Sequence, residues 1–354
     1  MLADVAIVGG GPAGCSAALT LLAKGYTVVL FDVPSSKEKP TETSPATLRA
    51  LLQSLGAAEA LDSCRPCYGI SSKWGQLRRL QDTGITDPRG HSWFIDRTGF
   101  DQRMKDAVTR AGGKWIRSFV NSLSHHEESI SLIASDKQTT ARWVILASGS
   151  LQHSARLIHQ QRRKLDSLLA FWTRLKAALP QPLLSVESAL PGWWYACPDH
   201  DDGIIVCLMT DAPAARTLHL FDGFEWERQF GKTELCQSIG SYRRTAPLRT
   251  SVADLANLET TSGSRWTLAG DAAVKLDPLG SSGTKFAIDS GQRAASAVDQ
   301  MLKGNLQELK RYNLWCQDLF QAFVRQRNDM YCAEDLNAEN EFWLRRTQSS
   351  RLST

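Results

Sequence analysis

The chain has 354 residues, of which 42% are hydrophobic, and a formal net charge of +4. This length predicts two or three packed units, and the balanced composition is that of a globular protein with no indication of a nucleic-acid partner. No stretch of about 18 apolar residues lacks both glycine and charge, so a membrane span is not expected.

The chain opens with a strand, a glycine-rich turn and a helix of small residues, and a second apolar strand at 27–31 ends in Asp32. In this fingerprint the first glycine permits the tight turn, the second lets a pyrophosphate approach, and the third lets the helix pack on the strand. The helix N-terminus offers free N–H groups to phosphates, and the acid can accept hydrogen bonds from ribose hydroxyls. A Gly-Pro-Ala-Gly turn this close to the start favours FAD over NAD. The cofactor-binding residues predicted here are Gly9, Gly11, Pro12, Ala13, Gly14 and Asp32.

Strands and helices alternate through the rest of the first 150 residues, which predicts a doubly wound sheet. The pattern predicts helices at 46–55 and 100–111, and strands at 69–74, 93–95, 130–134 and 143–146. The basic cluster at 162–164 is interpreted as a solvated helix face.

Short strands in succession then predict an antiparallel sheet in a second domain. They are expected at 183–187, 193–197, 204–210 and 216–220. A buried strand near 266–271, a long helix at 284–302 and a helical tail at 306–342 follow. The predicted domains are a discontinuous FAD-binding domain at 1–180 and 265–303, a substrate domain at 181–264, and a helical C-terminal segment at 304–354. Residues 60–95 are a candidate contributor to the substrate sheet.

The stretch after the 266–271 strand supplies the second half of the predicted cofactor site. Asp271 ends the strand, where its carboxylate can accept hydrogen bonds from a polyol such as ribitol. The following turn presents a helix N-terminus, whose dipole can stabilise negative charge on a reduced flavin. Taken alone, a Gly-Asp pair can end any strand and a glycine-rich turn can start any helix; taken together with residues 5–32, the stretch predicts a joint FAD site. The cofactor-binding residues predicted here are Gly270, Asp271, Pro278, Gly280 and Gly283.

These paired motifs resemble those of the flavoprotein monooxygenases and the flavin-dependent tryptophan halogenases. Residues 39–45 resemble a Gly-Glu-containing loop of that family, with Thr41 in place of the glycine. Residues 95–101 resemble its Asp-Arg-x-x-Phe-Asp helix start, and residues 192–198 resemble its Trp-rich strand. The tail at 342–346 is similar to that of a short branch that matures quinoprotein amino-acid oxidases, such as glycine oxidase and lysine ε-oxidase.

The resemblance implies an α/β fold: an FAD-binding Rossmann-like domain of the glutathione-reductase type 2, an antiparallel-sheet substrate domain and a helical tail. It implies that Arg97 lies near the FAD phosphates and Glu42 near the flavin; the alternative for Glu42 is a charge at a helix N-terminus. Residues Trp193, Trp194 and Tyr195 alternate on a predicted strand. They line an aromatic substrate pocket or pack in the core.

The activity that the resemblance implies is FAD-dependent hydroxylation of an indole, with a Trp side chain of a quinoprotein precursor as substrate during cysteine tryptophylquinone biogenesis. Such a reaction takes O2, and its electrons come from NAD(P)H or from a separate reductase. Titratable candidates for catalysis are Glu42, Lys73 and Asp277. Lys73 is also the candidate for the lysine through which halogenases deliver hypohalous acid. The alternatives are a halogenase, a geranylgeranyl-reductase-like FAD reductase and a flavin-bound chaperone of the immature partner.

The cysteines suggest reduced thiols, and no metal site is expected. Cys64 and Cys67 form a Cys-x-x-Cys pair, which leaves a redox or metal role open, although no second pair of that spacing follows. The first strand begins within five residues of the start, so no signal peptide is expected and a cytoplasmic location is predicted.

Overall fold

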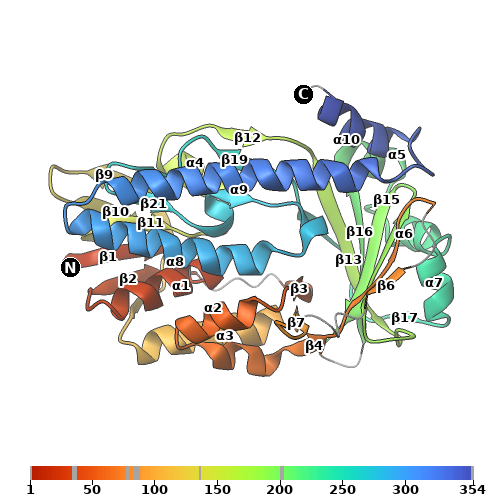
Figure 1. Cartoon of the computed structure of the whole chain (residues 1–354), viewed down its shortest axis with the longest axis horizontal. Coiled ribbons are helices and arrows are strands. Elements are labelled where there is room, and N and C mark those ends of the chain that lie inside the picture. The colour runs from red at the N-terminus through yellow and green to blue at the C-terminus, as the bar shows by residue number, and fades with distance from the viewer. Residues whose placement is uncertain are drawn as a thin grey trace.

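The computed structural model describes residues 2–33, 38–76, 80–82, 88–134, 137–199 and 203–351. In this part of the chain, two sheets of eight strands lie toward opposite ends of the molecule (Figure 1). The long helix α9 (Gln307–Cys332) passes along both of them (Figure 1). This is the α/β flavoprotein architecture that the sequence predicts.

The first sheet has a parallel centre in the order β21-β11-β1-β2-β8. Its central strands read as nearly continuous apolar runs because the side chains on both faces of the sheet are buried. Its strands are β1 (Leu2–Val8), β2 (Val28–Phe31), β8 (Lys114–Ile116), β9 (Val120–His125), β10 (Ile130–Ala134), β11 (Lys137–Leu146), β20 (Ser262–Gly263) and β21 (Trp266–Leu268).

Helices α1 (Pro12–Leu22) and α8 (Gly283–Leu302) pack against each other beside this sheet. A Cβ at Gly291 would lie 2.2 Å from the Ala13 carbonyl oxygen, so the two backbones approach this closely only because position 291 has no side chain. The other helices of this part are α2 (Leu48–Ser54), α3 (Arg97–Arg110), α4 (Leu151–Leu157) and the 3-10 turns η1 (Ala58–Ser63), η2 (Gly270–Ala272) and η3 (Pro278–Gly280).

The second sheet runs in the order β17-β13-β16-β15-β14-β5-β6, with β18 paired to β13. Its pairings are antiparallel except for β14 with β5. Segment 60–95 thus adds β5 and β6 to this sheet, while the predicted domain boundaries stay predictions. The strands are β5 (Ile70–Lys73), β6 (Leu80–Asp82), β13 (Leu168–Lys176), β14 (Leu184–Ala189), β15 (Gly192–Pro198), β16 (Ile204–Asp211), β17 (Arg243–Arg244) and β18 (Arg249–Val252).

One face of the second sheet is covered by short helices, and the other faces the first sheet (Figure 1). The covering helices are α5 (Ala212–Thr217), α6 (Gly223–Phe230) and α7 (Glu234–Ile239). Helix α10 (Glu341–Arg351) packs at one end of the inner face. Two three-stranded sheets complete the described part: β3 (Glu42–Ser44), β7 (Ser92–Ile95) and β4 (Arg65–Cys67), and β12 (Arg162–Lys164), β19 (Ala256–Leu258) and β22 (Val274–Lys275).

Two predicted elements are wrong. The strand expected at 216–220 is helix α5 and the turn after it, because Asp211 caps the Ala214 N–H at 3.0 Å and Pro213 occupies the first helical turn. The basic cluster expected on a helix is strand β12, which pairs with β19 and turns Arg162 toward the buried Asp254.

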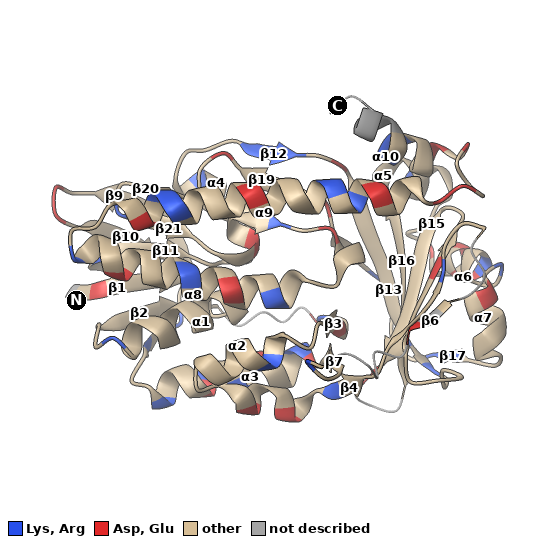
Figure 2. Cartoon of the chain, viewed as in Figure 1, with Lys and Arg blue, Asp and Glu red and all other residues tan. Residues whose placement is uncertain are grey.

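Positively and negatively charged residues alternate along the ribbons of α8 and α9 (Figure 2), with no stripe of one sign on those helices in this view. None of the helices in the described part of the chain combines the length and hydropathy needed to cross a lipid bilayer.

Candidate active site

The glycine turn between β1 and α1 is closed at two glycines and open at the third. A Cβ at Gly9, which has a φ of +111°, would lie 2.3 Å from the Ala147 carbonyl oxygen, and one at Gly14 would lie 1.9 Å from the Gly9 carbonyl oxygen. Nothing lies within 4 Å of a Cβ placed at Gly11, the N-cap of α1. The open space and the N–H groups of the first helical turn together form a cradle that fits a phosphate.

Asp32 lies at the carboxyl end of β2, beside that turn. Its Oδ1 accepts from the Gly10 N–H at 3.0 Å, and its Oδ2 accepts from Lys105 Nζ at 2.6 Å. The side chain is 20% exposed, so the carboxylate is held in place and still has an accessible edge. Lys105 is absent from the sequence prediction because it lies 73 residues away and belongs to no motif.

Gly270 and Asp271 bring the second half of the site against the first. A Cβ at Gly270 would lie 2.8 Å from the Ala13 Cβ, so the end of β21 touches the start of α1. Burial raises the pKa of Asp271 to about 6. Among the described residues no hydrogen bond or ion pair reaches this carboxylate. An unpartnered carboxylate beside the phosphate cradle fits a ligand rich in hydroxyl groups, such as the ribityl chain of FAD.

Glu42 joins three elements. Its Oε1 accepts from Arg97 Nη1 at 2.6 Å and its Oε2 from Thr284 Oγ1 at 2.7 Å, so β3, α3 and α8 meet at one carboxylate. Arg97 also donates to Asp101 at 3.2 Å. Burial opposes the charge of Arg97, but Glu42 and Asp101 outweigh it and raise the pKa of the guanidinium. Glu42 is therefore a paired, oriented carboxylate at the N-terminus of α8.

The turn η3 leads into α8 and has open space at Gly283, where a Cβ would meet nothing within 4 Å. At Gly280 a Cβ would lie 2.9 Å from the Phe323 ring. Asp277, just before the turn, has partners on both oxygens: the Leu279 N–H at 2.9 Å and Arg327 Nε at 2.7 Å. Pro278 thus follows an anchored residue, and the predicted catalytic role of Asp277 stays a prediction.

The Trp-rich strand β15 presents its side chains to two different surroundings. Trp194 packs on the outer face, with ring centroids 5.2 Å from Trp226. Trp193 and Tyr195 lie on the inner face, in the cluster that also contains Leu279 of η3. Cys197 of the same face contacts the carbonyl oxygen of Thr41 at 3.9 Å. The inner aromatic face therefore borders the Glu42 loop at one end and the η3 turn at the other.

Lys73 lies on the opposite face from Trp193 and Tyr195, on the same outer face as Trp194. It pairs with Glu234 at the start of α7, and its register partner on β14 is Glu187. Glu187 accepts the backbone N–H groups of Glu234 and Leu235 at 3.0 and 2.6 Å, which places both side chains toward α7. In Figure 1, α7 lies beyond the second sheet as seen from β3 and α8.

The two thiols of the Cys-x-x-Cys pair are largely withdrawn from solvent, with Cys64 half-buried and Cys67 buried. Burial raises the pKa of Cys64 to about 11 and also raises the pKa of Cys67. Both are free cysteines, and the described part of the chain holds no group of three or more His, Cys, Asp or Glu side chains that could bind a metal.

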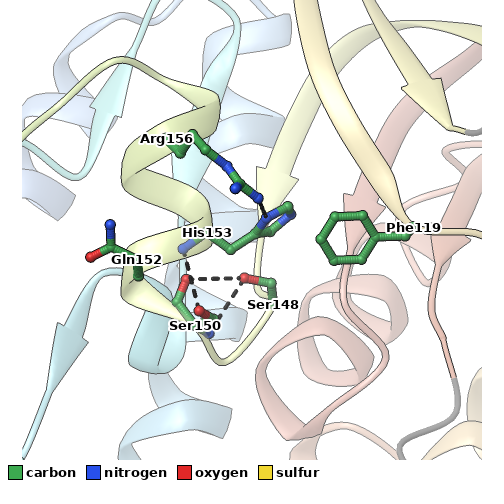
Figure 3. Close-up of a pocket in the computed structure, with 6 residues that line it drawn as sticks. All are labelled: Phe119, Ser148, Ser150, Gln152, His153 and Arg156. Carbon is green, nitrogen blue, oxygen red and sulfur yellow. Dashed lines mark hydrogen bonds between the residues drawn. The ribbon is translucent and has the colours of Figure 1, made fainter.

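A pocket of about 320 Å³ lies at the carboxyl end of β11 (Figure 3). It borders the glycine turn, because a Cβ at Gly9 would lie 2.7 Å from the Ser148 Cα. The Phe119 and His153 rings are 4.5 Å apart, and Arg156 Nη2 lies 3.3 Å from His153 Nδ1. The sequence prediction missed this pocket; its signal was the strand at 143–146 running into Ala-Ser-Gly. The lining residues are Phe119, Ser148, Ser150, Gln152, His153 and Arg156.

Comparison with known proteins gives related chains at low identity. The family model described as lycopene cyclase protein matches residues 4–165. The chain is 23% identical over 367 residues to LodB of Marinomonas mediterranea, named as an FAD-dependent oxidoreductase, covering 99% of this chain and 98% of that one. It is also 23% identical to the flavin-dependent halogenase gsfI of Penicillium aethiopicum, covering 86% of this chain but 66% of the halogenase.

Solved structures share the fold. CmlS, a flavin-dependent halogenase, superposes with a TM-score of 0.85 at 22% identity, covering all of this chain and 70% of CmlS. QhpG, described as a peptidyl tryptophan dihydroxylase essential for tryptophylquinone cofactor biogenesis, gives a TM-score of 0.75 at 20% identity, with 98% and 79% covered. The fold prediction is confirmed, and so are the predictions that the cofactor is FAD and that the chain is an FAD-dependent oxidoreductase.

Proposed function

We propose that this FAD-dependent oxidoreductase hydroxylates an aromatic ring, and that the ring is the indole of a Trp side chain in a partner protein. One observation carries the choice of hydroxylation: the face of the second sheet that borders the Glu42 loop and the η3 turn holds Trp193 and Tyr195, whereas Lys73 lies on the other face. The proposed electron source is NAD(P)H or a separate reductase.

In this proposal the residues of the first sheet hold the cofactor. Gly11 and the start of α1 bind the pyrophosphate, Asp32 the ribose and Asp271 the ribityl chain. The η3 turn and the N-terminus of α8 lie beside the flavin ring, where the helix dipole favours negative charge. Reduced FAD supplies the reaction with O2, and the protein orients the substrate.

The inner face of the second sheet supplies the apolar surroundings that keep water from the reacting ring. Trp193 is 2% exposed. Burial raises the pKa of Tyr195 well above its ordinary value, so its hydroxyl stays protonated and can donate a hydrogen bond. Arg97 pairs with Glu42, so this carboxylate acts as an oriented acceptor near the ring rather than as a free base.

Halogenation is the second candidate, because several curated relatives are named as halogenases. Such chemistry needs a lysine ammonium between the flavin and the substrate. For Lys73 to take that place, it would have to leave Glu234 and cross to the other face of β5. A protein substrate is favoured by the likeness to QhpG over 98% of this chain.

The test is co-expression of the chain with a quinoprotein amino-acid oxidase precursor, followed by mass spectrometry of the precursor's Trp-containing peptides. We expect one or two added oxygen atoms that depend on this chain and are lost in its Gly11→Ala variant. A parallel culture with bromide separates the alternatives, since a brominated peptide or product indicates a halogenase. An unmodified precursor beside a yellow, FAD-loaded protein would contradict the proposed substrate.

A further inference from the structure

Three buried side chains form a continuous hydrogen-bonded path between the aromatic face and the flavin-facing turn. Trp193 Nε1–H donates to the Tyr331 hydroxyl oxygen at 3.0 Å. The Tyr331 hydroxyl in turn donates to Asp277 Oδ2 at 3.2 Å. Asp277 precedes η3 directly and accepts the Leu279 N–H with its other oxygen. A single phenol from helix α9 therefore links a wall of the proposed substrate site to the turn beside the proposed flavin.

All three side chains are removed from solvent: Tyr331 is fully buried, and Trp193 and Asp277 are each 2% exposed. Hydrogen bonds in such surroundings are strong, and a partner left without its bond is destabilising. Arg327, one turn earlier on α9, donates to the same Asp277 oxygen at 2.7 Å and also pairs with Asp166. The carboxylate is thus neutralised by one cation and oriented by one phenol.

Packing alone does not explain why a tyrosine stands at position 331, because a phenylalanine would fill nearly the same volume. The hydroxyl serves two partners at once, as acceptor for the indole N–H and as donor to the carboxylate. Removing it leaves the indole N–H of Trp193 without this acceptor and leaves the negative charge of Asp277 screened by one donor fewer. The first change lies on the substrate side of the proposed active site, and the second lies on its flavin side.

We propose that Tyr331 is a positioning residue, which holds Trp193 against the substrate side and, through its hydrogen bond, orients and screens the Asp277 carboxylate beside the flavin turn. This inference rests on the proposed function, because it takes the cofactor to lie at η3.

The test compares Tyr331→Phe with Tyr26→Phe, and the measured quantity is the reduction potential of bound FAD without substrate. Tyr26 is the matched control: its hydroxyl also donates to a carboxylate, Asp299 at 3.0 Å, at a place remote from η3. We expect Tyr331→Phe to disfavour reduced flavin about tenfold, which is about 30 mV more negative for a two-electron couple. The control should retain the wild-type potential.

Trp193→Phe is the second variant and covers the case in which Tyr331→Phe does not fold. It removes the donor to the Tyr331 oxygen and so weakens the hydrogen bond from Tyr331 to Asp277. We therefore expect the reduction potential of bound FAD to shift in the same direction but by a smaller amount. Wild-type potentials in both variants would overturn the inference while leaving the proposed function intact. A wild-type protein that binds no FAD would instead overturn the proposed function.

Discussion

Asp271 provides a quantitative test of the proposed cofactor site. Its carboxylate has a folded-state pKa of about 6 against an ordinary value of 3.8, because burial disfavours the ionised form. The folded protein therefore binds this proton more tightly than the unfolded chain does. The contribution of Asp271 to stability is greatest below about pH 4 and is lost as the pH rises through 6.

The size follows from the two pKa values. A separation of about two units at 1.36 kcal/mol per unit means that the ionised carboxylate destabilises the folded apoprotein by about 3 kcal/mol near pH 8. Near pH 5 the same expression gives about half of this value. We therefore expect Asp271→Asn to stabilise the apoprotein by about 3 kcal/mol near pH 8 and by about 1.5 kcal/mol near pH 5.

Urea unfolding of the apoprotein at the two pH values measures this difference, and FAD titration measures the opposite effect on binding. Ribityl hydroxyls donate to a carboxylate more strongly than to an amide, so FAD affinity should fall about tenfold in the variant. Asp254→Asn is the control of opposite sign: burial opposes ionisation of Asp254, but Lys275 and Arg162 outweigh it and lower its pKa. An Asp271→Asn variant that is less stable at both pH values would refute the reasoning.

Three further outcomes follow from the geometry. Gly11→Ala should leave the thermal midpoint of the apoprotein within about 2 °C and lower FAD affinity at least tenfold. Gly14→Ala should instead destabilise the fold, because a Cβ at Gly14 meets backbone atoms and one at Gly11 does not. Calorimetry and FAD titration separate the two variants. Lys73→Ala should change unfolding free energy by less than about 1 kcal/mol and leave hydroxylation intact, since Glu234 is half exposed; loss of all turnover would contradict its placement. Asp211→Asn should speed proteolysis of α10, because the carboxylate pairs with Arg345 and Arg346; an unchanged digest would show that aromatic packing alone holds the helix.

The close packing of the glycine turn could be predicted because it depends on backbone conformation, while the cofactor contacts of these residues stay predictions. There is no room for a side chain at Gly9 or Gly14, so only glycine fits, and this requirement is visible in the sequence itself. The contact of Gly270 with Ala13 could be expected only through the family resemblance, because a separation of more than 250 residues carries no local signal. Lys105 of helix α3 pairs with Asp32 at the end of β2, and no sequence spacing predicts such a tertiary contact.

The second sheet was harder to predict, because its strand β13 reads as an apolar run that local patterns do not distinguish from a helix. The alternation of side chains along the Trp-rich segment could be predicted, and it places Trp194 on one face of the sheet and Trp193 and Tyr195 on the other. Which of the two faces meets the cofactor depends on where β4, β7 and η3 pack. That information lies in the tertiary structure.

The proposal of hydroxylation rather than halogenation depends on the register of a single strand. Because side chains alternate along β5, a slip of one residue against β14 would bring Lys73 to the aromatic face. Trp74 opposes that slip: its ring lies 5.5 Å from the Trp343 ring, and its Nε1–H donates to the Met330 carbonyl at 2.8 Å. Glu187 opposes it from the other side by accepting two N–H groups of α7. The register is thus fixed on both faces, and with it the position of the lysine away from the proposed substrate.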